Sequence, residues 1–392
     1  MKRTMILVFK LGFTVVIVGA VVMFYVLNFK NPVRNANGNI ESEVELQPKD
    51  PKNQEPVQGN KISDEAESRI HIAVVACGER LEETIVMLKS STLLTKSKLQ
   101  FHIFAENDLH APFKKELDAW PDGVKERTAY SIYPITFPDG ENAEEWKKLF
   151  KPCASQRLFL PNILANVDSI LYVDTDILFM RPLDDIWAFF GKFNSSQIAA
   201  LAPESEDAAT GWYNRFARHP FYGKLGVNSG VMLMNLTRMR IVNWQDYILP
   251  YYKQYKLKIT WGDQDLINIF FHYHPEKLYI YPCQWNYRPD HCMYMSVCKL
   301  AEMDGVSVLH GSRGVYHNEK QPAFKAVYTA MKQYTFDGDL KSDLVDKANA
   351  LLMEPTSRGT NCGKVSQLYF KQFQKHLHDR KAQDNSQKKP PS

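Results

Sequence analysis

Hydrophobic and polar positions along the chain follow two alternating patterns. Short apolar runs typical of buried strands are followed by stretches with apolar residues at helical spacing, as at Leu81, Ile85 and Leu88. Repeated strand–helix alternation is typical of an α/β fold with a mostly parallel sheet and crossover helices. We expect strands at residues 70–76, 99–105, 130–137, 170–173, 198–203, 230–236, 277–282 and 306–309, and helices at 81–94, 109–120, 154–164 and from 261 onward.

The amino-terminal part of the chain departs from this alternation. Residues 11–29 are almost wholly apolar and long enough to cross a bilayer as a helix, and Lys2, Arg3 and Lys10 precede them. The positive-inside rule then predicts an uncleaved signal anchor of a single-pass type II membrane protein, with the remainder on the lumenal side. A cleaved signal peptide is the alternative, but the apolar stretch is long for that role and no clear cleavage site follows it.

Polar composition defines the remaining boundaries. Residues 31–67 are rich in Pro, Asn, Gln, Glu and Lys and nearly lack aromatic residues, so we expect them to bury too little surface to fold. After about Val365 the chain becomes basic and then low in complexity. We expect a cytosolic tail at 1–10, the anchor at 11–29, a disordered stem at 30–68, one folded domain at 69–375 and a disordered tail at 376–392.

The strand-like run at 170–173 ends in two carboxylates. Asp174 and Asp176, separated by Thr175, follow it directly. Residues i and i+2 of an extended chain project from the same face, and open α/β sheets bind ligands at the carboxyl ends of their strands. Two converging carboxylates repel each other unless a cation lies between them, and oxygen ligands favour Mg²⁺ or Mn²⁺. The alternative is a pair of exposed loop aspartates.

A histidine also follows a strand-like run, as the two aspartates do, and two cations lie after it in the sequence. His310 follows the run at 306–309 and enters a turn that contains Gly311, which makes it a candidate third metal ligand. The alternative is a hydrogen-bonded loop histidine. Arg313 and Lys320 are candidates for neutralising a phosphate group, or else they are solvated surface cations.

Two polar turns and one cation are weaker candidates for contacts with a bound ligand. Asn228 and Ser229 precede a strand-like run, and Asp263 and Gln264 lie at a helix start. Each pair either binds sugar hydroxyls or caps the backbone. Arg157, on the helix before the acidic pair, faces either a diphosphate or solvent.

Composition limits the kinds of partner and the cellular compartment that fit this chain. The formal net charge is only +4 and the basic residues are scattered, so the sequence does not predict a nucleic-acid groove. Six cysteines fit an oxidising lumen, although their pairing cannot be read from the sequence. The alternative use of these residues is a zinc site formed by Cys283, His291, Cys292 and Cys298, but their spacing matches no common zinc pattern.

Candidate N-glycosylation triplets begin at Asn194 and Asn235.

Two chemistries compete for the aspartate pair. In phosphatases of the haloacid dehalogenase type, an Asp-x-Asp follows a buried strand and its first Asp is the nucleophile, but the motif normally lies on the first strand of the domain. Several strand–helix units precede Asp174 here. In a nucleotide-sugar transferase the preceding half binds the nucleotide, which fits the roughly hundred residues between Ile70 and Asp174.

Four ordered segments carry a resemblance to a known family. They are Leu171-Tyr-Val-Asp-Thr-Asp-Ile-Leu, Gly226-Val-Asn-Ser-Gly-Val-Met-Leu-Met-Asn, Trp261-Gly-Asp-Gln-Asp-Leu-Ile-Asn and Leu309-His-Gly. In this order they resemble the signatures of family-8 glycosyltransferases, over about residues 70–325. With Ile72-Ala-Val-Val-Ala-Cys-Gly, Arg313-Gly-Val-Tyr-His and the stem-anchored layout, the chain is similar to the glucoside xylosyltransferases.

The resemblance implies a GT-A-like domain that moves xylose from UDP-xylose, in α1,3 linkage, onto O-linked glucose of EGF-like repeats such as those of Notch. It implies Mn²⁺ or Mg²⁺ as cofactor and residence in the Golgi or endoplasmic reticulum. The implied metal ligands are Asp174, Asp176 and His310. The implied donor-binding residues are Val75, Ala76, Cys77, Gly78, Arg157, Asp174, Thr175, Asp176, Ser229, Gly311, Arg313 and Lys320, and the implied catalytic residues are Asn228, Asp263 and Gln264.

The resemblance leaves alternatives. Lys320 lies farther from His310 than the family's usual spacing, so either Lys320 or Arg313 faces the diphosphate. The rival functions are an enzyme of the same fold that uses UDP-glucose or UDP-galactose, and a lumenal binding protein without catalysis. The intact metal set argues against the latter. For a retaining reaction we favour front-face attack with Asp263 as a positioning group, over a nucleophile on the far face of the sugar.

Overall fold

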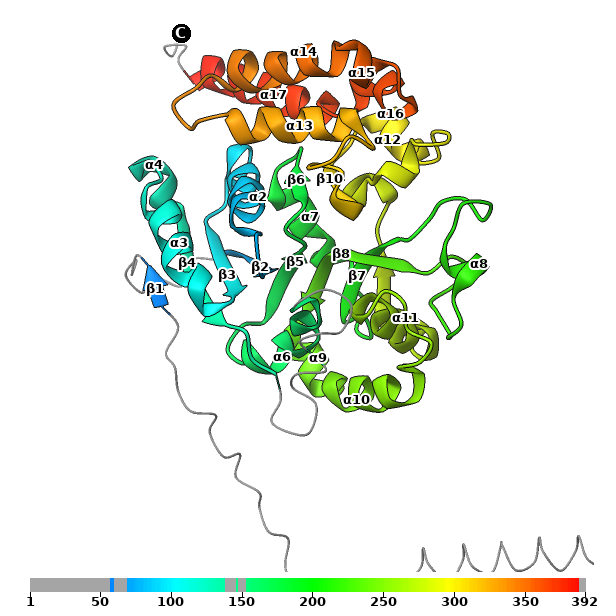
Figure 1. The fold of residues 1–392 in the computed structure, drawn as a ribbon. Helices are drawn as coiled ribbons and strands as arrows, with labels where there is room; N and C mark the ends of the chain where they lie inside the picture. The colour runs from blue at the N-terminus through cyan, green and yellow to red at the C-terminus, as the bar shows by residue number, and fades with distance from the viewer. Residues whose placement is uncertain (1–56, 60–68, 138–145, 147–152, 388–392) are drawn as a thin grey trace, which may run out of the picture. The chain divides into compact units, whose positions relative to one another are not determined.

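The computed structural model describes residues 57–59, 69–137, 146 and 153–387 (Figure 1). The expected anchor at 11–29 and nearly all of the expected stem lie outside these residues. Among the helices that are described, none combines the length and the apolar character needed to cross a membrane. Three residues assigned to the stem form strand β1, which lies at the edge of the sheet and pairs with β4.

A mixed, mostly parallel sheet forms the centre of the domain. Its order is β1-β4-β3-β2-β5-β8-β7-β9. Strands β4, β3, β2 and β5 are parallel, β8 runs antiparallel between β5 and β7, and β9 is parallel to β7. The α/β class expected from the alternation is confirmed. The strands are β1 (Val57–Gly59), β2 (Ile70–Ala76), β3 (Leu99–Ala105), β4 (Thr128–Pro134), β5 (Ser169–Val173), β7 (Ala199–Pro203), β8 (Val227–Asn235) and β9 (Leu278–Ile280).

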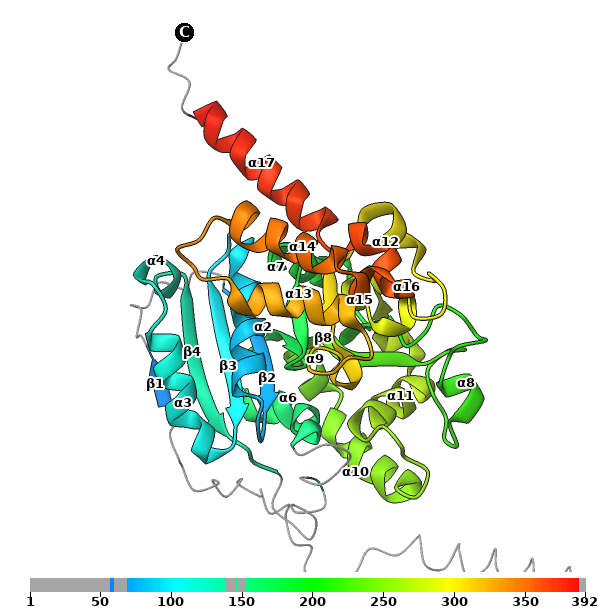
Figure 2. The same cartoon turned by 45° about the horizontal axis from the view of Figure 1, so that its top comes forward.

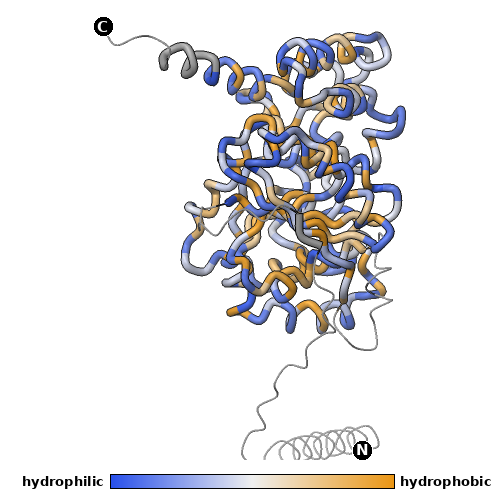
Figure 3. The backbone as a smooth tube through the Cα atoms, turned by 90° about the vertical axis from the view of Figure 1, so that its left-hand side faces the viewer, coloured by the Kyte–Doolittle hydropathy of each residue, from blue (hydrophilic) through white to orange (hydrophobic). Residues whose placement is uncertain are grey.

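Strand β5 is buried on both faces because residues 170–173 form an unbroken apolar run. On β5, Leu171 and Val173 face one hydrophobic cluster, whereas Ile170 and Tyr172 face the other. This is the side-chain alternation of an extended strand. Figure 3 shows hydrophobic segments of the backbone running through the interior of the domain.

Helices cover the sheet, and helices from the carboxyl-terminal part of the chain form a separate layer. Helix α13 packs against α2 and α14, and Figures 1 and 2 show α13 and α14 side by side in this layer. The helices are α2 (Leu81–Leu93), α3 (Asn107–Asp118), α4 (Asp122–Lys125), α6 (Leu160–Ile163), α7 (Leu183–Trp187), α8 (Tyr213–Phe216), α9 (Leu236–Ile241), α10 (Trp244–Tyr255), α11 (Asp263–Tyr273), α12 (Lys299–Asp304), α13 (Pro322–Gln333), α14 (Lys347–Met353), α15 (Pro355–Arg358), α16 (Asn361–Lys364) and α17 (Lys371–Gln387).

Helix α17 extends into the segment expected as a disordered tail, residues 376–392, of which 388–392 lie outside the described residues. The chain is helical through Gln387. Leu377 packs against the core, and the Arg380 guanidinium donates to the carbonyl oxygens of Leu93 and Leu94 at 3.4 and 3.2 Å. These carbonyls lie at the end of α2, where a helix leaves acceptors without internal partners. This contact connects α17 to α2, which lies far from it in the sequence.

A second, two-stranded sheet connects the two halves of the chain. Strand β6 (Ile177–Phe179) begins directly after Asp176, and it pairs antiparallel with β10 (Val308–His310). In this register His310 is opposite Ile177. The small sheet therefore brings the histidine beside the acidic pair, although more than a hundred residues separate them in sequence.

Candidate active site

Asp174, Asp176 and His310 converge at the end of β5. One ligand atom from each lies within 4.8 Å of the others. Nε2 of His310 is 3.3 Å from Oδ1 of Asp176 and 3.9 Å from Oδ2 of Asp174. Backbone bonds fix the turn, since the Asp174 amide donates to the Gly230 carbonyl and the Gly311 amide donates to that of Asp176. The arrangement has the donor types and the convergence of a divalent cation site.

Arg157 joins this group from the other side. Its Nη2 donates to Oδ1 of Asp174 at 2.8 Å, its Nε is 2.5 Å from Oδ2 of Asp263, and its Nη1 donates to the Ser229 carbonyl at 2.6 Å. The guanidinium also lies 4.3 Å from the centroid of the Tyr172 ring. Arg157 is buried, so this fork of contacts fixes its position.

Asp263 is the first residue of α11 and is almost fully buried. Burial raises the pKa of its carboxyl to about 6, against the opposing effect of Arg157. The expected helix start is confirmed. The side chain of Asp263 forms an ion pair with Arg157, and Gly262 is the capping residue.

Two amides expected at the site meet at a carboxylate that the sequence analysis missed. Oε2 of Glu204 accepts from Nδ2 of Asn228 at 2.8 Å and from Nε2 of Gln264 at 3.4 Å. Oε1 of Gln264 accepts from the Ser229 amide at 3.1 Å. Glu204 directly follows β7, so the rule that singled out Asp174 would also have found it.

A second missed carboxylate supports the acidic turn. Glu83, in the first turn of α2, is buried and accepts a hydrogen bond from the Thr175 hydroxyl. Arg80 lies 2.8 Å from the same carboxylate and His317 contacts its other oxygen. Thr175 lies between the two metal-ligand candidates, so Glu83 fixes the turn that presents them.

The segment expected to contact the nucleotide, Val75 to Gly78, leaves β2 at the same edge of the sheet. Cys77 forms a disulfide with Cys153, which directly precedes the 3-10 turn that carries Arg157. The Gly78 amide donates to the Glu106 carboxylate at 2.9 Å. The disulfide therefore ties this strand end to the Arg157 segment.

The remaining cysteines overturn the zinc alternative. They are used in the pairs Cys283–Cys298 and Cys292–Cys362, so their sulfur atoms are not thiolate ligands. All six cysteines of the chain are thus in disulfides, which is typical of an oxidising compartment.

The two cations expected at the diphosphate lie in exposed positions. The Arg313 guanidinium is half exposed and forms an ion pair with Asp290, 2.5 Å away. The Lys320 side chain is exposed, and its backbone amide donates to Asn318. Which cation faces a diphosphate stays a prediction.

The two candidate glycosylation asparagines differ in exposure. Asn194 is exposed, and its side chain accepts from the amides of Ser196 and Gln197. Asn235 is half-buried and caps α9 through the Arg238 amide at 2.8 Å. Glycosylation itself stays a prediction at both.

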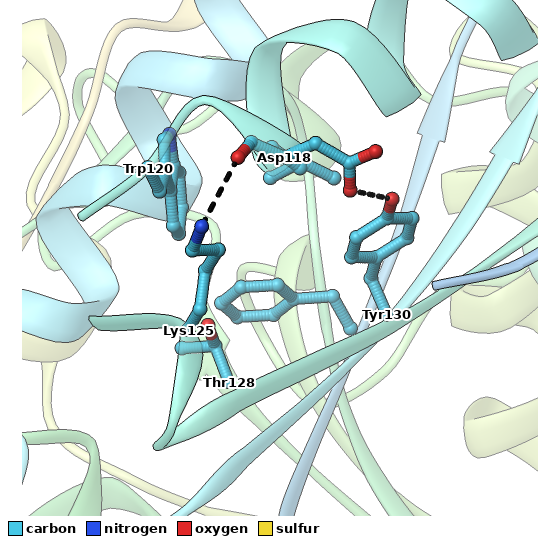
Figure 4. A pocket seen from close by; sticks show the side chains of 7 residues that line it. Asp118, Trp120, Lys125, Thr128 and Tyr130 are labelled. Carbon is cyan, nitrogen blue, oxygen red and sulfur yellow. Dashed lines mark hydrogen bonds between the residues drawn. The ribbon is translucent and has the colours of Figure 1, made fainter. Parts of the chain in front are cut away.

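A pocket outside this site is shown in Figure 4. Thr128, the first residue of β4, lies at its edge, so the pocket is at the opposite end of the parallel strands from the acidic pair. Asp118 accepts from the Tyr130 hydroxyl, and its carbonyl accepts from Lys125. These polar groups are paired with one another, so we assign the pocket no chemistry. Its lining is Phe101, Leu117, Asp118, Trp120, Lys125, Thr128 and Tyr130.

A mixed α/β sheet with an acidic pair and an imidazole at its ligand-binding edge has the architecture of a GT-A-type glycosyltransferase. The fold is similar to the crystal structure of an active-site mutant of LgtC, with a TM-score of 0.52 and 16% identity over 70% of this chain and 100% of that one.

The sequence comparisons identify the family. The model of glycosyl transferase family 8 matches residues 71–310. Glucoside xylosyltransferase 2 of Xenopus laevis is 57% identical over 322 residues, covering 79% of this chain and 75% of that protein. Glucoside xylosyltransferase 1 of Homo sapiens is 57% identical over 331 residues, covering 82% and 74%. The chain belongs to glycosyl transferase family 8, in the group of the glucoside xylosyltransferases, and is an enzyme of that family.

Proposed function

We propose that this enzyme transfers xylose from UDP-xylose, in α1,3 linkage and with retention, to O-linked glucose on EGF-like repeats such as those of Notch. The observation that carries the proposal is the meeting of Asp174, Asp176 and His310 beside the Arg157–Asp263 pair. The names of the relatives support xylose as the sugar and a glucoside as the acceptor.

The three converging residues fit a divalent cation. Two carboxylates and an imidazole nitrogen suit Mn²⁺ or Mg²⁺, and the carboxylates repel each other in the absence of positive charge. Bound there, the ion would offset the negative charge that grows on the departing nucleoside diphosphate.

The protein groups around this point orient the reactants. Arg157 holds Asp174 and Asp263 in place, and Glu204 holds the amides of Asn228 and Gln264. In a front-face reaction the acceptor hydroxyl oxygen bonds to the anomeric carbon as the carbon–oxygen bond to the diphosphate breaks, and the hydroxyl proton passes to the diphosphate. Asp263 then acts as a positioning group, because its carboxylate is engaged by Arg157.

We place this reaction in the lumen of the Golgi or endoplasmic reticulum, with the enzyme held by an anchor at residues 11–29. The three disulfides support an oxidising compartment. The positive charges ahead of the apolar segment support the lumenal orientation.

The test is donor selectivity of the full chain in detergent micelles. Turnover with UDP-xylose, UDP-glucose and UDP-galactose is measured on a synthetic O-glucosylated EGF repeat, and the linkage of the product is determined by NMR. We expect UDP-xylose to be preferred by at least about tenfold, a difference of 1.4 kcal/mol in transition-state binding. Preference for a hexose donor would replace the assigned sugar, and failure to hydrolyse or transfer any donor would favour a binding protein.

Metal dependence is tested on the same preparation. Chelation should abolish transfer and added Mn²⁺ should restore it, whereas Asp176→Asn should remain inactive at every Mn²⁺ concentration. Full activity after exhaustive chelation would overturn the cation site. It would not affect the assignment of the donor sugar, which the selectivity measurement tests independently.

A further inference from the structure

Asn286 is a fully buried residue next to the acidic site that no sequence motif singled out. It ends a 3-10 turn, Cys283–Asn286, whose first residue is held by the disulfide to Cys298. Two backbone bonds of the following residue join this turn to β10: the Tyr287 amide donates to the Val308 carbonyl, and the His310 amide donates to the Tyr287 carbonyl, each at 2.9 Å. Asn286 therefore has a fixed position relative to His310.

Hydrogen-bond directions in this region can be assigned from one backbone group. The Gly230 amide can only donate, and it lies 3.0 Å from Oδ1 of Asn228. Nδ2 of Asn228 then points to the Glu204 carboxylate, which can only accept when ionised. Oδ1 of Asn228 also receives a bond from Nδ2 of Asn286 at 2.8 Å. The orientation of both amides follows from these contacts.

The chain of bonds ends at the imidazole. With Nδ2 of Asn286 directed to Asn228, Oδ1 of Asn286 faces Nδ1 of His310 at 2.8 Å. An amide oxygen is an acceptor only, so Nδ1 must carry the proton. In the neutral ring Nε2 then presents its lone pair to Asp174 and Asp176.

The ring is also confined on its other side. A Cβ atom on Gly230 would lie 2.3 Å from Cε1 and 2.8 Å from Nδ1 of His310, closer than real contacts allow. The glycine thus supplies the space for the ring, and Asn286 determines which nitrogen points into the acidic site.

We propose that Asn286 is a positioning residue that fixes the Nδ1–H tautomer of His310 and so sets the affinity of the site for a divalent cation. The inference rests on the proposed function only in treating Asp174, Asp176 and His310 as cation ligands. Partners that hold the second nitrogen of a metal-binding histidine typically change metal affinity by about 10- to 100-fold when they are removed.

Two substitutions at Asn286 separate this role from simple structural support. Asn286→Leu removes the acceptor for Nδ1–H and the donor to Asn228. Asn286→Asp keeps an acceptor for Nδ1–H but sets a carboxylate against Oδ1 of Asn228. A positioning role predicts that the Asp variant binds the cation better than the Leu variant, whereas purely structural support predicts that it binds no better.

The measurement is binding of Mn²⁺ alone, by electron paramagnetic resonance, to the full chain in micelles without nucleotide. We expect Asn286→Leu to weaken binding by about 10- to 100-fold and Asn286→Asp to stay within about threefold of the wild type. Asn268→Leu is the control, because Asn268 is equally buried and binds the Val227 and Gln264 backbone rather than His310. It should lose stability but keep Mn²⁺ affinity.

The outcomes are distinguishable. A folded Leu variant with wild-type affinity, or an Asp variant as weak as the Leu variant, would overturn the positioning role alone. If the Leu variant does not fold, the Asp variant decides, together with the nitrogen-15 shifts of His310, which should report Nδ1–H in the wild type. A wild-type chain without Mn²⁺ binding would overturn the cation site and the positioning role together.

Discussion

The two flanks of the acidic pair are built in different ways. On one side Arg157 brings a permanent, buried positive charge that is shared between Asp174 and Asp263. On the other side His310 is held by neutral amides through Asn286. Both flanks are buried, yet one compensates negative charge inside the protein and the other leaves a lone pair free to bind a cation.

The difference assigns each flank its own task. A charge-assisted fork fixes distance and charge at the same time, and it is costly to break because it leaves buried carboxylates unpaired. The hydrogen bonds that link Asn228, Asn286 and His310 fix the orientation and the tautomer of the imidazole without adding charge. The imidazole can therefore act as a neutral ligand. The charged flank should therefore be sensitive to loss of charge, and the neutral flank to loss of space or direction.

The largest expected effect comes from removing the charge of the first flank. Arg157→Gln leaves Asp263 buried without its cation, so we expect a loss of about 3–5 kcal/mol in unfolding free energy. We also expect at least about 100-fold lower kcat, because the charge near the developing negative centre is lost. Urea unfolding and steady-state transfer assays measure the two.

The double variant Arg157→Gln/Asp263→Asn is the matched control. It removes both members of the buried pair, so it should regain most of the lost stability but little of the activity. An unchanged stability in the single variant would show that the pair is not compensating charge inside the protein.

The neutral flank should fail when its space is filled. Gly230→Ala places a Cβ 2.3 Å from Cε1 of His310 and 3.1 Å from Oδ2 of Asp174. We expect a cost of about 1–3 kcal/mol from overpacking and about tenfold weaker Mn²⁺ binding from a displaced ring. Gly123→Ala is the control, since an added Cβ there meets no atom within 4 Å. Equal Mn²⁺ affinity in both variants would contradict the confined ring.

The charged flank should also respond to pH through Asp263. Its folded pKa is raised to about 6 by burial, above the ordinary value of 3.8, so the folded state holds the proton where the unfolded state has lost it. The stability that this group contributes is full below pH 3.8 and is lost as pH rises through about 6.

The check is the pH dependence of the difference between wild type and Asp263→Asn. Urea unfolding across this range should show the wild type losing about 2–3 kcal/mol relative to the variant as the pH rises. A difference that does not change with pH would mean that burial does not control this carboxyl.

The parts of this site that local sequence could predict are those that follow an apolar run in the sequence. Strands β2 and β3 have the bounds expected from their apolar runs, and the acidic pair and His310 follow such runs. Their meeting depended on β6, a three-residue strand too short to show a pattern. The sequence could therefore name the candidate ligands from local pattern but not the pairing that joins them.

Residues that act through tertiary contacts gave no local signal. Asn286 lies in a 3-10 turn without periodicity, and Glu83 reads as an ordinary first-turn acid of a helix. The helix at the start of the expected tail was missed because the partners of Arg380, at Leu93 and Leu94, are 287 and 286 residues away. Composition predicts solvation well only where no such partner exists.

The smallest effect on unfolding free energy should come from replacing Arg313. Comparing Arg313 with Arg157 tests whether burial or residue type makes Arg157 important for stability. Arg313 also pairs with an aspartate, but its side chain is 50% exposed, whereas that of Arg157 is 5% exposed. Exposed pairs contribute about 0–1 kcal/mol because water and salt screen them. Arg313→Lys should therefore change unfolding free energy by less than about 0.5 kcal/mol, while Arg157→Lys, which cannot form the same planar fork, should cost several times more.

Salt makes this contrast sharper. Raising ionic strength should remove the small effect at Arg313 but leave that at Arg157, because buried pairs are screened much less. Urea unfolding at low and high salt measures both variants. If Arg157→Lys were as mild and as salt-dependent as Arg313→Lys, then burial would not distinguish the charged flank from an ordinary surface pair. The two tasks assigned to the flanks would then have no energetic basis.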